Sequence, residues 1–458
     1  MKIRHASSLN GRVPLSGDKS IAHRALLLGT LARGTTRIAN VPHSDDLAAT
    51  RRCLEALGVP IERNGGGALY VRGGALRESP SPLDCGGSGT TIRLIAGLLA
   101  GQPLMTVLSA NAQLARRPMD RIIEPLQLMG ADVSALARVS SALSHGMGEG
   151  REGASLAASA PEGQGANGRY PLLVIRGGRL RAIDYRTPVA SAQIKSCILL
   201  AALNADGEST VRESAPTRDH TERMLRAMGV QVTRDRAQGT GDSVVTLTPS
   251  PLTALDITVP NDFSSAAFFV VAALLAPQSD LLLESVGLNP TRTGLLDIIR
   301  MMGGDVEQSA VREENGEPVG DLRVRTAGGM LAAHVGGQLV PRAIDEFPLV
   351  ALLATQAEGE TVVRDAAELR VKESDRVASV VLELRRMGAQ IDERPDGFVV
   401  CGPTRLRGAR VDAHGDHRLA MMLAVAGLIA EGETLIDGFE CVSKSFPDFE
   451  RVLYALMQ

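Results

Sequence analysis

The sequence predicts an α/β protein made of two similar domains, each built from three copies of one repeating unit. The chain has 458 residues, which is too many for one ordinary hydrophobic core. The same order of elements recurs six times: a polar start, an apolar helix, a turn containing glycine, a short strand and an amphipathic helix. The first helix of each repeat is apolar nearly all round, so we expect these helices to be buried inside the domains.

The repeats are placed by the polar residues that precede each apolar helix. In the first repeat, Ser20 is a natural N-cap for a helix over 21–32, which is followed by a strand at 36–41 and a helix at 46–57. The later repeats start at Ser88, Ser191, Asp262, Asp345 and Asp416. Their expected elements include a strand at 104–108, apolar helices at 266–275, 349–354 and 419–429, and an amphipathic helix at 374–386. Repeats of about 70–80 residues are too long for a solenoid of the usual kinds, which favours two domains of three repeats.

The stretch 135–169 breaks this pattern. It is rich in Ala, Gly and Ser and has no apolar periodicity. We interpret it as a flexible surface insertion between the second and third repeats. A lid over a functional site is the alternative.

Composition narrows the kinds of function. The formal net charge is −3, and aromatic residues make up 3% of the chain with no Trp, which argues against binding to nucleic acid. The five cysteines are scattered without a CxxC pair, as expected for reduced thiols in the cytoplasm. We see no signal peptide in the first residues and no apolar run of membrane-spanning length. Any anion that the protein binds must therefore be held by locally placed cations.

The segment Ser16–Arg24 has the composition of an anion-binding site. Lys19 and Ser20 lie at the start of a helix, and Arg24 follows one turn later. A hydroxyl group, two cations and free backbone N–H groups at the positive end of a helix dipole attract an anion. A capped helix with solvated charges is the alternative. The recurrence of polar helix starts favours a binding site, because several helix dipoles would converge on one cleft.

Further charged segments stand at helix starts in the second half of the chain. Arg370–Arg376 is the densest in charge, and Lys372 and Arg376 share one helix face if the helix begins early. Arg418 stands at the start of a wholly apolar helix, where a site is favoured over a surface charge. Asp345 is either a simple helix cap or a general base whose pKa is raised by desolvation.

A set of short motifs runs along the chain: Gly17-Asp18-Lys19-Ser20 with Arg24, Ser88-Gly89-Thr90, Arg117-Pro118, Ser191-Ala192-Gln193, Thr217-Arg218-Asp219-His220, Asn289-Pro290-Thr291-Arg292, Arg370–Arg376, Asp416-His417-Arg418 and Ser445-Phe446-Pro447. Each motif is weak by itself, but together they are highly specific. The set resembles that of the 5-enolpyruvylshikimate-3-phosphate synthase family, the 3-phosphoshikimate 1-carboxyvinyltransferases. The resemblance covers essentially the whole chain apart from 135–169.

This resemblance implies an α/β fold of two similar domains, each of three βαβαββ units with buried helices and outer sheets, the enolpyruvyl transferase-like inside-out barrel. One domain would comprise residues 1–19 and 252–458, and the other residues 20–251. The two crossings near 16–19 and 250–255 would form a hinge. The substrates would bind between the domains, which would close over them.

The resemblance also implies a reaction and its residues. The enolpyruvyl group of phosphoenolpyruvate would be transferred to the 5-hydroxyl of shikimate 3-phosphate with release of phosphate, in the shikimate pathway of aromatic amino-acid biosynthesis. Asp345 would take the hydroxyl proton, and Glu373 would handle the proton at C3 of phosphoenolpyruvate. The residues implied to bind shikimate 3-phosphate are Lys19, Ser20, Arg24, Ser191, Ala192, Gln193, Arg218, Asp345 and Lys372. Those implied to bind phosphoenolpyruvate are Lys19, Gly89, Arg117, Gln193, Arg376, Arg418 and Lys444. No metal and no organic cofactor are implied, and we expect a monomer.

One position departs from the family's pattern, and two alternatives stay open. Gly87 stands where members usually carry Asn, so one side-chain contact to phosphoenolpyruvate is missing or supplied otherwise. The sister enzyme UDP-N-acetylglucosamine enolpyruvyl transferase is one alternative, but it usually carries a Cys where this chain has Ala112. The other is a noncatalytic protein that binds a phosphometabolite. It is distinguished by whether both Asp345 and Glu373 lie in the cleft with the cations.

Overall fold

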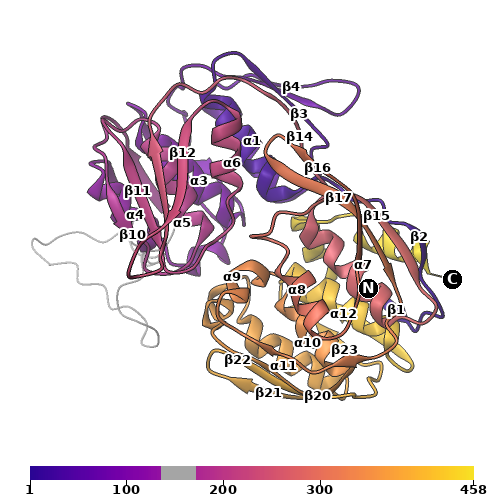
Figure 1. Ribbon diagram of the computed structural model, residues 1–458. Helices are drawn as coiled ribbons and strands as arrows, with labels where there is room; N and C mark the ends of the chain where they lie inside the picture. The colour runs from indigo at the N-terminus through magenta and orange to yellow at the C-terminus, as the bar shows by residue number, and fades with distance from the viewer. Residues whose placement is uncertain (136–171, 458) are drawn as a thin grey trace, which may run out of the picture.

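The computed structural model describes residues 1–135 and 172–457, and Figure 1 shows that these residues form two lobes. The first lobe contains the first three repeats, and the second lobe contains the last three. The insertion expected at 135–169 lies outside the described residues, apart from Ala135, which ends a strand.

The first lobe begins at the first apolar helix. Its first repeat consists of α1 (Lys19–Leu31), β3 (Thr35–Ala39), α2 (Asp45–Ala56), β4 (Ile61–Arg63) and β5 (Leu69–Arg72). The second consists of β6 (Leu83–Asp84), α3 (Gly89–Ala100), β7 (Met105–Ser109), the 3₁₀ helix η1 (Leu114–Arg116), α4 (Asp120–Leu128), β8 (Asp132–Ala135) and β9 (Leu172–Arg176). The third consists of β10 (Asp184–Arg186), α5 (Ala192–Ala202), β11 (Ser209–Glu213), α6 (His220–Ala227), β12 (Gln231–Arg236) and β13 (Ser243–Thr248).

The second lobe repeats this order. The fourth repeat consists of α7 (Phe263–Leu275), β15 (Asp280–Gly287), α8 (Gly294–Met301), β16 (Glu307–Glu314) and β17 (Glu317–Arg325). The fifth consists of β18 (Met330–Leu331), β19 (His334–Val335), α9 (Leu339–Ala343), α10 (Phe347–Thr355), β20 (Ala357–Val363), the 3₁₀ helix η2 (Ala367–Val371), α11 (Arg376–Arg386), β21 (Gln390–Arg394) and β22 (Gly397–Gly402). The sixth consists of β23 (Arg410–Asp412), α12 (His417–Ile429), β24 (Glu433–Asp437), the 3₁₀ helix η3 (Phe439–Lys444) and α13 (Phe449–Leu456). None of the helices in the described residues is long and apolar enough to cross a membrane.

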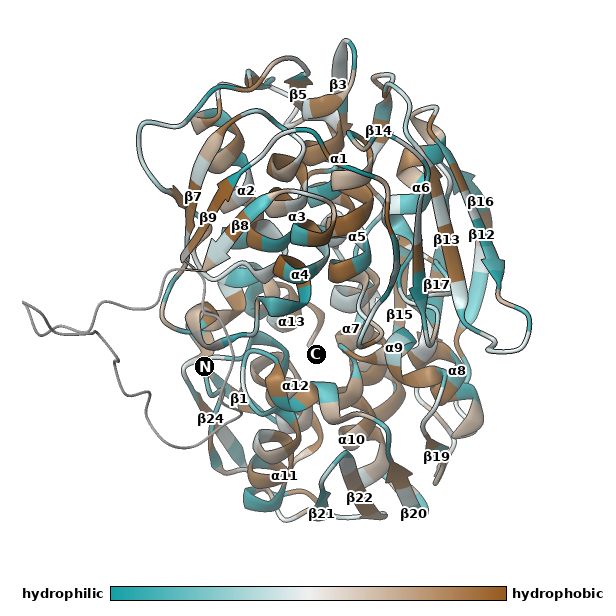
Figure 2. Ribbon diagram, turned by 90° about the vertical axis from the view of Figure 1, so that its left-hand side faces the viewer, coloured by the Kyte–Doolittle hydropathy of each residue, from teal (hydrophilic) through white to brown (hydrophobic). Residues whose placement is uncertain are grey.

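Each repeat contributes most strands of one small sheet on the outside of its lobe, and the apolar helices lie inside (Figure 1). The sheet orders are β14–β3–β5–β4, β6–β7–β9–β8 and β10–β11–β13–β12 in the first lobe, and β16–β17–β15–β2, β18–β20–β22–β21 and β1–β24–β23 in the second. The central helices are α1, α3 and α5 in one lobe and α7, α10 and α12 in the other, and they supply much of the two hydrophobic cores. Figure 2 shows the contrast between apolar residues on these helices and polar residues on outer strands such as β16. The predicted fold of buried helices and outer sheets is confirmed.

Three strands lie in a sheet away from their neighbours in the sequence. The N-terminal strands β1 (Lys2–Arg4) and β2 (Asn10–Arg12) both belong to the second lobe, where β1 pairs with β24 and β2 runs parallel to β15. Conversely, β14 (Asp256–Thr258) runs parallel to β3 in the first lobe. The chain crosses between the lobes twice, and the crossings touch where Gly17 pairs with Asn261.

This pairing moves the second crossing along the chain. Leu252, Ile257 and Val259 are buried in the first lobe's core, whereas Phe263 is the first buried residue of the second lobe's core after the crossing. The sequence placed this crossing near 250–255, but the chain leaves the first lobe only after Val259. The error arose because a three-residue strand paired with a distant partner leaves no local signal.

The cap of α1 also differs from the expectation. The side chain of Asp18, not Ser20, accepts a hydrogen bond from the backbone N–H of Ile21, at 2.8 Å. Gly17 is required just before it, because a Cβ atom there would lie 1.9 Å from the carbonyl oxygen of Asn40. Ser20 is thus in the first turn of α1, where its hydroxyl is not used as a cap.

Candidate active site

A cavity of about 480 Å³ lies between the two lobes. The starts of α1, α3, α5, α10 and α12 all contribute to its lining, so five of the six buried helices direct their positive ends toward it. The start of α7 lines a separate cavity of about 20 Å³ next to it. The expected convergence of polar helix starts on one cleft is therefore observed for the described residues.

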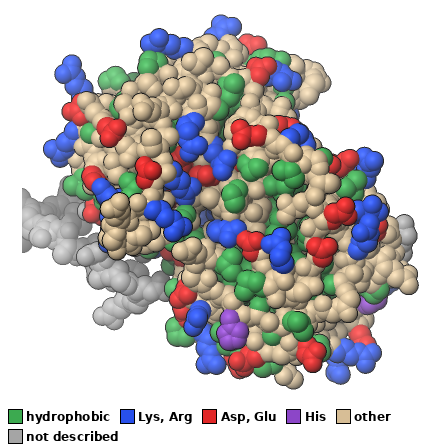
Figure 3. Space-filling view, in the orientation of Figure 1, with side chains coloured by type: hydrophobic (Ala, Val, Ile, Leu, Met, Phe, Trp, Pro, Cys, Tyr) green, Lys and Arg blue, Asp and Glu red, His purple; other side chains and the backbone are tan. Residues whose placement is uncertain are grey.

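The lining is rich in cations drawn from both lobes. Nine Lys and Arg side chains contribute: Lys19, Arg24, Arg93, Arg117, Arg121, Arg218, Lys372, Arg418 and Lys444. Five carboxylates contribute as well: Asp46, Asp345, Asp365, Glu368 and Glu373. Figure 3 shows Lys and Arg side chains gathered in the hollow between the lobes. A chain with a net negative charge thus encloses a cavity suited to anionic ligands.

The part of the cavity near α1 is built by the first lobe. Nζ of Lys19 donates to Asp46 at 2.7 Å. Arg24 is buried, with its Nη1 donating to the backbone oxygen of Ser20 at 2.9 Å and its other donors held by hydroxyl groups of α5 and α6. Burial, with a further contribution from the nearby Arg218, lowers the pKa of Arg24 to about 10.

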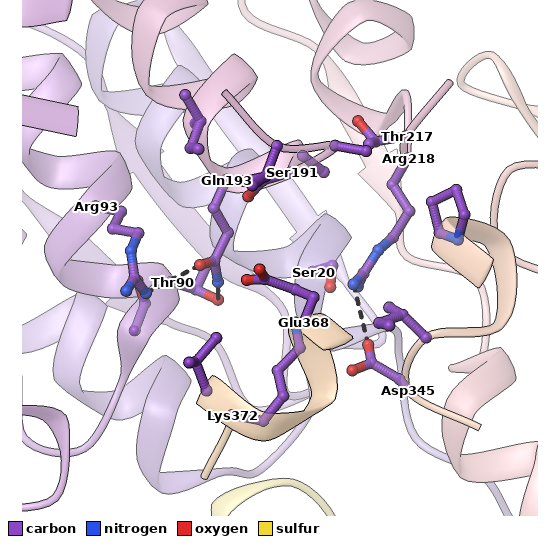
Figure 4. A pocket seen from close by; sticks show the side chains of 18 of the residues that line it. Ser20, Thr90, Arg93, Ser191, Gln193, Thr217, Arg218, Asp345, Glu368 and Lys372 are labelled. Carbon is purple, nitrogen blue, oxygen red and sulfur yellow. Dashed lines mark hydrogen bonds and ion pairs between the residues drawn. The ribbon is translucent and has the colours of Figure 1, made fainter. Parts of the chain in front are cut away.

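Gln193 joins two helix starts at the back of the cavity. Its side-chain amide donates to Oγ1 of Thr90 at 3.1 Å, and its carbonyl oxygen accepts from Nη1 of Arg93 at 3.0 Å, as Figure 4 shows. Arg93 also donates to the backbone oxygens of Gly89 and Pro118. Burial lowers the pKa of Arg93 to about 9, and the nearby Arg117 adds to this effect.

Asp345 lies within a group of arginines. Its Oδ2 is 2.8 Å from Nη1 of Arg292, 3.0 Å from Nη2 of Arg218 and 3.4 Å from Nη2 of Arg418. Burial alone would raise the pKa of Asp345, but Arg418, Arg218 and Arg292 hold it well below its usual range. The expectation that desolvation raises the pKa of Asp345 is therefore wrong, because the cations outweigh the burial.

Glu373 forms the second paired carboxylate. Its Oε2 accepts from Nη2 of Arg376 at 2.5 Å, and its Oε1 lies 3.2 Å from Nη2 of Arg117 in the other lobe. Burial would raise the pKa of Glu373, but Arg117 and Arg376 keep it well below its usual range. Glu373 is therefore ionised at neutral pH in this state.

Lys372 precedes α11 instead of lying on it, since the helix begins only at Arg376 with Asp375 as its cap. The expectation that Lys372 and Arg376 share a helix face is therefore wrong. Lys372 still lines the cavity, and burial lowers its pKa to about 8 despite the opposing effect of Asp345.

Several contacts join the lobes around the cavity. Nζ of Lys444 donates to Oε1 of Gln113 at 2.8 Å, and the amide of Gln113 donates to the backbone oxygen of Glu373 at 2.9 Å. Nη1 of Arg121 lies 2.7 Å from Oε1 of Glu368. The Arg121–Glu368, Arg117–Glu373 and Arg218–Asp345 pairs each join a cation of the first lobe to a carboxylate of the second, whereas Lys444 is held by the amide of Gln113.

The structure places almost every expected residue at the cavity. Those that line it are Lys19, Ser20, Arg24, Gly89, Arg117, Ser191, Ala192, Gln193, Arg218, Asp345, Lys372, Glu373, Arg418 and Lys444. Arg376 is the exception: its side chain is 1% exposed and is held by Asp416, at 2.7 Å, and by Glu373, so it lies behind the lining. Both Asp345 and Glu373 line the cavity together with the cations, which favours an enzyme over a noncatalytic binding protein.

Five charged residues of the lining were not predicted from the sequence: Asp46, Arg93, Arg121, Asp365 and Glu368. Arg93 is the one charged side chain in the apolar helix α3, which is a signal that could have identified it. Arg121 and Glu368 gave no such signal, because each lies in a polar segment. At the departing position Gly87, a Cβ atom would come within 3.0 Å of the Asn111 amide nitrogen, so the Asn111 side chain occupies the neighbouring space. Within the described residues, no group of three or more His, Cys, Asp or Glu side chains is arranged to hold a metal ion.

Comparison with known proteins agrees with this site. The sequence profile of EPSP synthase (3-phosphoshikimate 1-carboxyvinyltransferase) matches residues 3–161 and 161–453. The 3-phosphoshikimate 1-carboxyvinyltransferase of Desulforudis audaxviator is 48% identical over 460 aligned residues, which cover 100% of this chain and 99% of that protein. That of Geobacter sp. strain M21 is 44% identical, with the same coverage. The structure of EPSP synthase from Acinetobacter baumannii superposes with a TM-score of 0.82 at 37% identity, covering 99% of this chain and 97% of that one. With the family profile spanning nearly the whole chain and full-length relatives at this identity, the chain belongs to the EPSP synthase (3-phosphoshikimate 1-carboxyvinyltransferase) family.

Proposed function

We propose that the residues around the cavity divide between the two substrates of the family's reaction. The chain transfers the enolpyruvyl group of phosphoenolpyruvate to shikimate 3-phosphate, a step of the shikimate pathway of aromatic amino-acid biosynthesis. The observation that supports our assignment is the cavity itself, in which cations of both lobes surround two carboxylates. Both substrates are polyanions, and preorganised cations in a cavity shielded from water stabilise such ligands and the charge that develops between them.

We assign shikimate 3-phosphate to the side of the cavity formed by α1, α5 and the loop before α6. Lys19, Arg24 and Arg218 would hold its phosphate, since charged donors form the strongest hydrogen bonds to phosphate oxygens. The hydroxyls of Ser20 and Ser191, the backbone of Ala192 and the amide of Gln193 would hold the ring. Lys372 and Asp345 would face the 5-hydroxyl from the second lobe.

We assign phosphoenolpyruvate to the opposite side, near α3, α11 and α12. Arg117, Arg418 and Lys444 would bind its carboxylate and phosphate, with the backbone at Gly89 allowing close approach and Lys19 and Gln193 shared between the substrates. Guanidinium groups suit this task because their planar geometry matches carboxylate and phosphate groups. Arg376 was expected in this set, and from its buried place it would act through Glu373.

In the proposed chemistry, Glu373 delivers a proton to C3 of phosphoenolpyruvate, so that C2 becomes electrophilic. The 5-hydroxyl oxygen attacks C2 while its proton passes to Asp345. The tetrahedral adduct then loses inorganic phosphate, which leaves with the proton held by Asp345, while a proton of the new methyl group returns to Glu373 and the double bond is restored. General acid and base groups of this kind must be within hydrogen-bond reach of the atoms that exchange protons.

The ionised state of Glu373 fits this role only if substrate binding changes it. When the carboxylate or phosphate of phosphoenolpyruvate takes Arg117, Glu373 loses a cation at 3.2 Å and gains an anionic neighbour. Both changes favour the protonated carboxyl. We therefore propose that binding of phosphoenolpyruvate causes Glu373 to take up the proton that Glu373 then delivers to C3.

We also propose that the lobes move. Each lobe holds part of the site, and the two crossings at 16–18 and 260–262 are the covalent links between them. A dianionic ligand that bridges cations of both lobes binds the closed form better, which is the condition for a shift toward it. A monomer in the cytoplasm completes the proposal, and gel filtration with light scattering tests the monomer.

The assay that tests the assignment mixes phosphoenolpyruvate with shikimate 3-phosphate and follows phosphate release. Asp345→Asn and Glu373→Gln should each lower kcat by orders of magnitude while both substrates still bind. Arg300→Gln, which removes an exposed arginine from α8, serves as the control and should keep normal rates. Near-normal kcat in Asp345→Asn or Glu373→Gln would contradict the assigned roles.

A further inference from the structure

Arg292 is an unassigned arginine in the Asn289-Pro290-Thr291-Arg292 motif. Its side chain is 4% exposed and lines the small cavity next to α7, not the larger cavity between the lobes. The motif forms a tight turn ahead of α8, in which Oδ1 of Asn289 accepts from the N–H of Thr291 at 2.9 Å and the backbone oxygen of Asn289 accepts from the N–H of Arg292 at 2.8 Å. The turn places the arginine in the wall behind Asp345.

The guanidinium of Arg292 is fixed on two sides. Nη1 donates to Oδ2 of Asp345 at 2.8 Å, while Nη2 donates to the hydroxyl of Ser264. That hydroxyl in turn donates to Oε1 of Glu346, and Asp262 lies 3.9 Å from Nη2. A buried arginine that donates to Asp345 on one side and to the Ser264 hydroxyl on the other has little freedom to turn away.

The two oxygens of Asp345 differ in their surroundings. Oδ2 receives Arg292 at 2.8 Å and Arg218 at 3.0 Å, both within hydrogen-bond distance. Oδ1 lies 3.5 Å from Nη1 of Arg376, which is beyond the distance of a good hydrogen bond. Oδ1 is therefore the oxygen with capacity left to accept a proton from a ligand.

The two arginines on Oδ2 also differ from each other. The side chain of Arg218 is 20% exposed, lines the larger cavity and belongs to the first lobe, and Figure 4 shows it reaching across to Asp345. It is free to exchange Asp345 for a ligand phosphate or to leave with its lobe. Arg292 belongs to the same lobe as Asp345 and cannot reach a ligand in the larger cavity without leaving its buried partners.

We propose that Arg292 is a positioning residue for this reaction, which holds Oδ2 of Asp345 throughout the catalytic cycle and presents Oδ1 to the substrate hydroxyl. The inference rests on the proposed function, in which Asp345 is the base. It predicts that Arg292 keeps Asp345 ionised when a substrate phosphate has drawn Arg218 away. An opposite charge at this distance lowers the pKa of a carboxyl group by about 1–3 units.

Other charges also act on Asp345 and set the size of the effect. The charged groups around it are Arg292 before α8, Arg218 before α6, Arg418 on α12, Arg376 on α11, Lys372 after η2 and its neighbour Glu346. Arg418 and Lys372 stay near Asp345 in the second lobe. The loss of Arg292 should therefore raise the pKa of Asp345 without abolishing its ionisation at high pH.

The test is the pH profile of kcat at saturating substrates, followed by phosphate release. In Arg292→Gln the acid limb of the profile should move to higher pH by about 1–3 units, because a base with a raised pKa is lost at a higher pH. KM for both substrates should change little, since Arg292 does not reach them. Arg292→Lys keeps the charge but loses the paired donors, so it should leave the acid limb near its normal place and lower kcat at all pH values. Arg300→Gln is the matched control on the exposed face of α8.

The results of these variants distinguish a failure of the proposed function from a failure of the role proposed for Arg292. If Asp345→Asn keeps a normal kcat, the proposed function fails whatever Arg292 does. If Asp345→Asn loses activity but Arg292→Gln lowers kcat equally at all pH values, Arg292 has only a structural role and the inference is overturned. If Arg292→Gln does not fold, Arg292→Lys decides: reduced kcat with unchanged KM supports positioning by the paired donors, and an unchanged kcat overturns it.

Discussion

The contacts of Glu373 predict that binding of phosphoenolpyruvate is accompanied by uptake of a proton at this side chain. Arg376 at 2.5 Å and Arg117 at 3.2 Å hold the pKa of Glu373 well below its usual range. We propose that phosphoenolpyruvate replaces Glu373 as the partner of Arg117. The perturbation that tests this is Glu373→Gln, which keeps the shape of the side chain and removes the titrating group.

The magnitude follows from the contacts. Loss of an opposite charge at this distance raises the pKa of a carboxyl group by about 1–3 units. A ligand anion at about 5 Å adds roughly 3 kcal/mol of repulsion at an effective dielectric constant near 20, which corresponds to about two further pKa units. Both changes raise the pKa of Glu373 from well below its usual range and favour its protonated form. Binding should therefore take up as much as one proton, and the Kd of phosphoenolpyruvate should rise by up to about tenfold per pH unit as pH increases.

Isothermal titration calorimetry in two buffers of different ionisation enthalpy measures this proton directly. A shikimate 3-phosphate analogue that lacks the 5-hydroxyl fills the other half of the site and prevents turnover. The phosphate of phosphoenolpyruvate also exchanges protons, so the informative quantity is the difference between the wild type and Glu373→Gln. Glu368→Gln, which removes a carboxylate paired with Arg121 at the same cavity, is the control and should keep the full uptake.

In Glu373→Gln the uptake assigned to Glu373 should vanish and kcat should collapse, while phosphoenolpyruvate binds as tightly as before or more tightly. The last result is expected because the variant removes both the competitor for Arg117 and a negative charge. Equal proton uptake in the wild type and in Glu373→Gln would refute the reasoning. So would binding that is tenfold weaker in the variant.

Three further results are expected. Arg218→Gln should raise KM for shikimate 3-phosphate by roughly 10–100-fold, from the loss of about 1.5–3 kcal/mol of charge-assisted contact, and an equal rise for phosphoenolpyruvate would contradict the assignment. Lys195→Met removes the cation that lies 2.8 Å from both Glu213 and Glu222 in the core, so urea unfolding should show a loss of about 3–5 kcal/mol; a loss below about 1 kcal/mol would contradict a stabilising role of this buried ion-pair cluster. Small-angle scattering should show a smaller radius of gyration when the shikimate 3-phosphate analogue and phosphoenolpyruvate are added, whereas an unchanged radius would contradict closure.

The sequence predicted those features that local residues determine. Each apolar helix with a polar start can be identified from its own residues. The convergence of helix dipoles on one cleft was then inferred from the recurrence of such helices. The cap of α1 was misplaced because Asp18 and Ser20 are both good capping residues, and the choice depends on the approach of Gly17 to Asn40. That approach is a tertiary contact which no local pattern reveals.

The residues of the site were predicted more completely than the pKa values of its two carboxyl groups. The pKa values of Asp345 and Glu373 depend on which arginines face them, and Arg292, Arg218 and Arg117 come from three distant segments. Arg376 was expected to face phosphoenolpyruvate, but it points into the wall toward Asp416. A charged helix start indicates that a site is near, whereas the direction of each side chain is set by its packing.

The strands β1, β2 and β14, which pair with distant parts of the chain, constrain the order in which the protein can fold during synthesis. The first lobe contains residues that are synthesised early, yet its first sheet lacks β14 until residue 258 has been made. Strand β2 can pair only after β15 has been made, and β1 only after β24, in which Leu435 is the partner of Lys2. Because β1 pairs with β24, the second lobe cannot be completed before residue 437 has been made. Because Lys444 lines the cavity, a partly made chain that ends before this residue lacks part of the site.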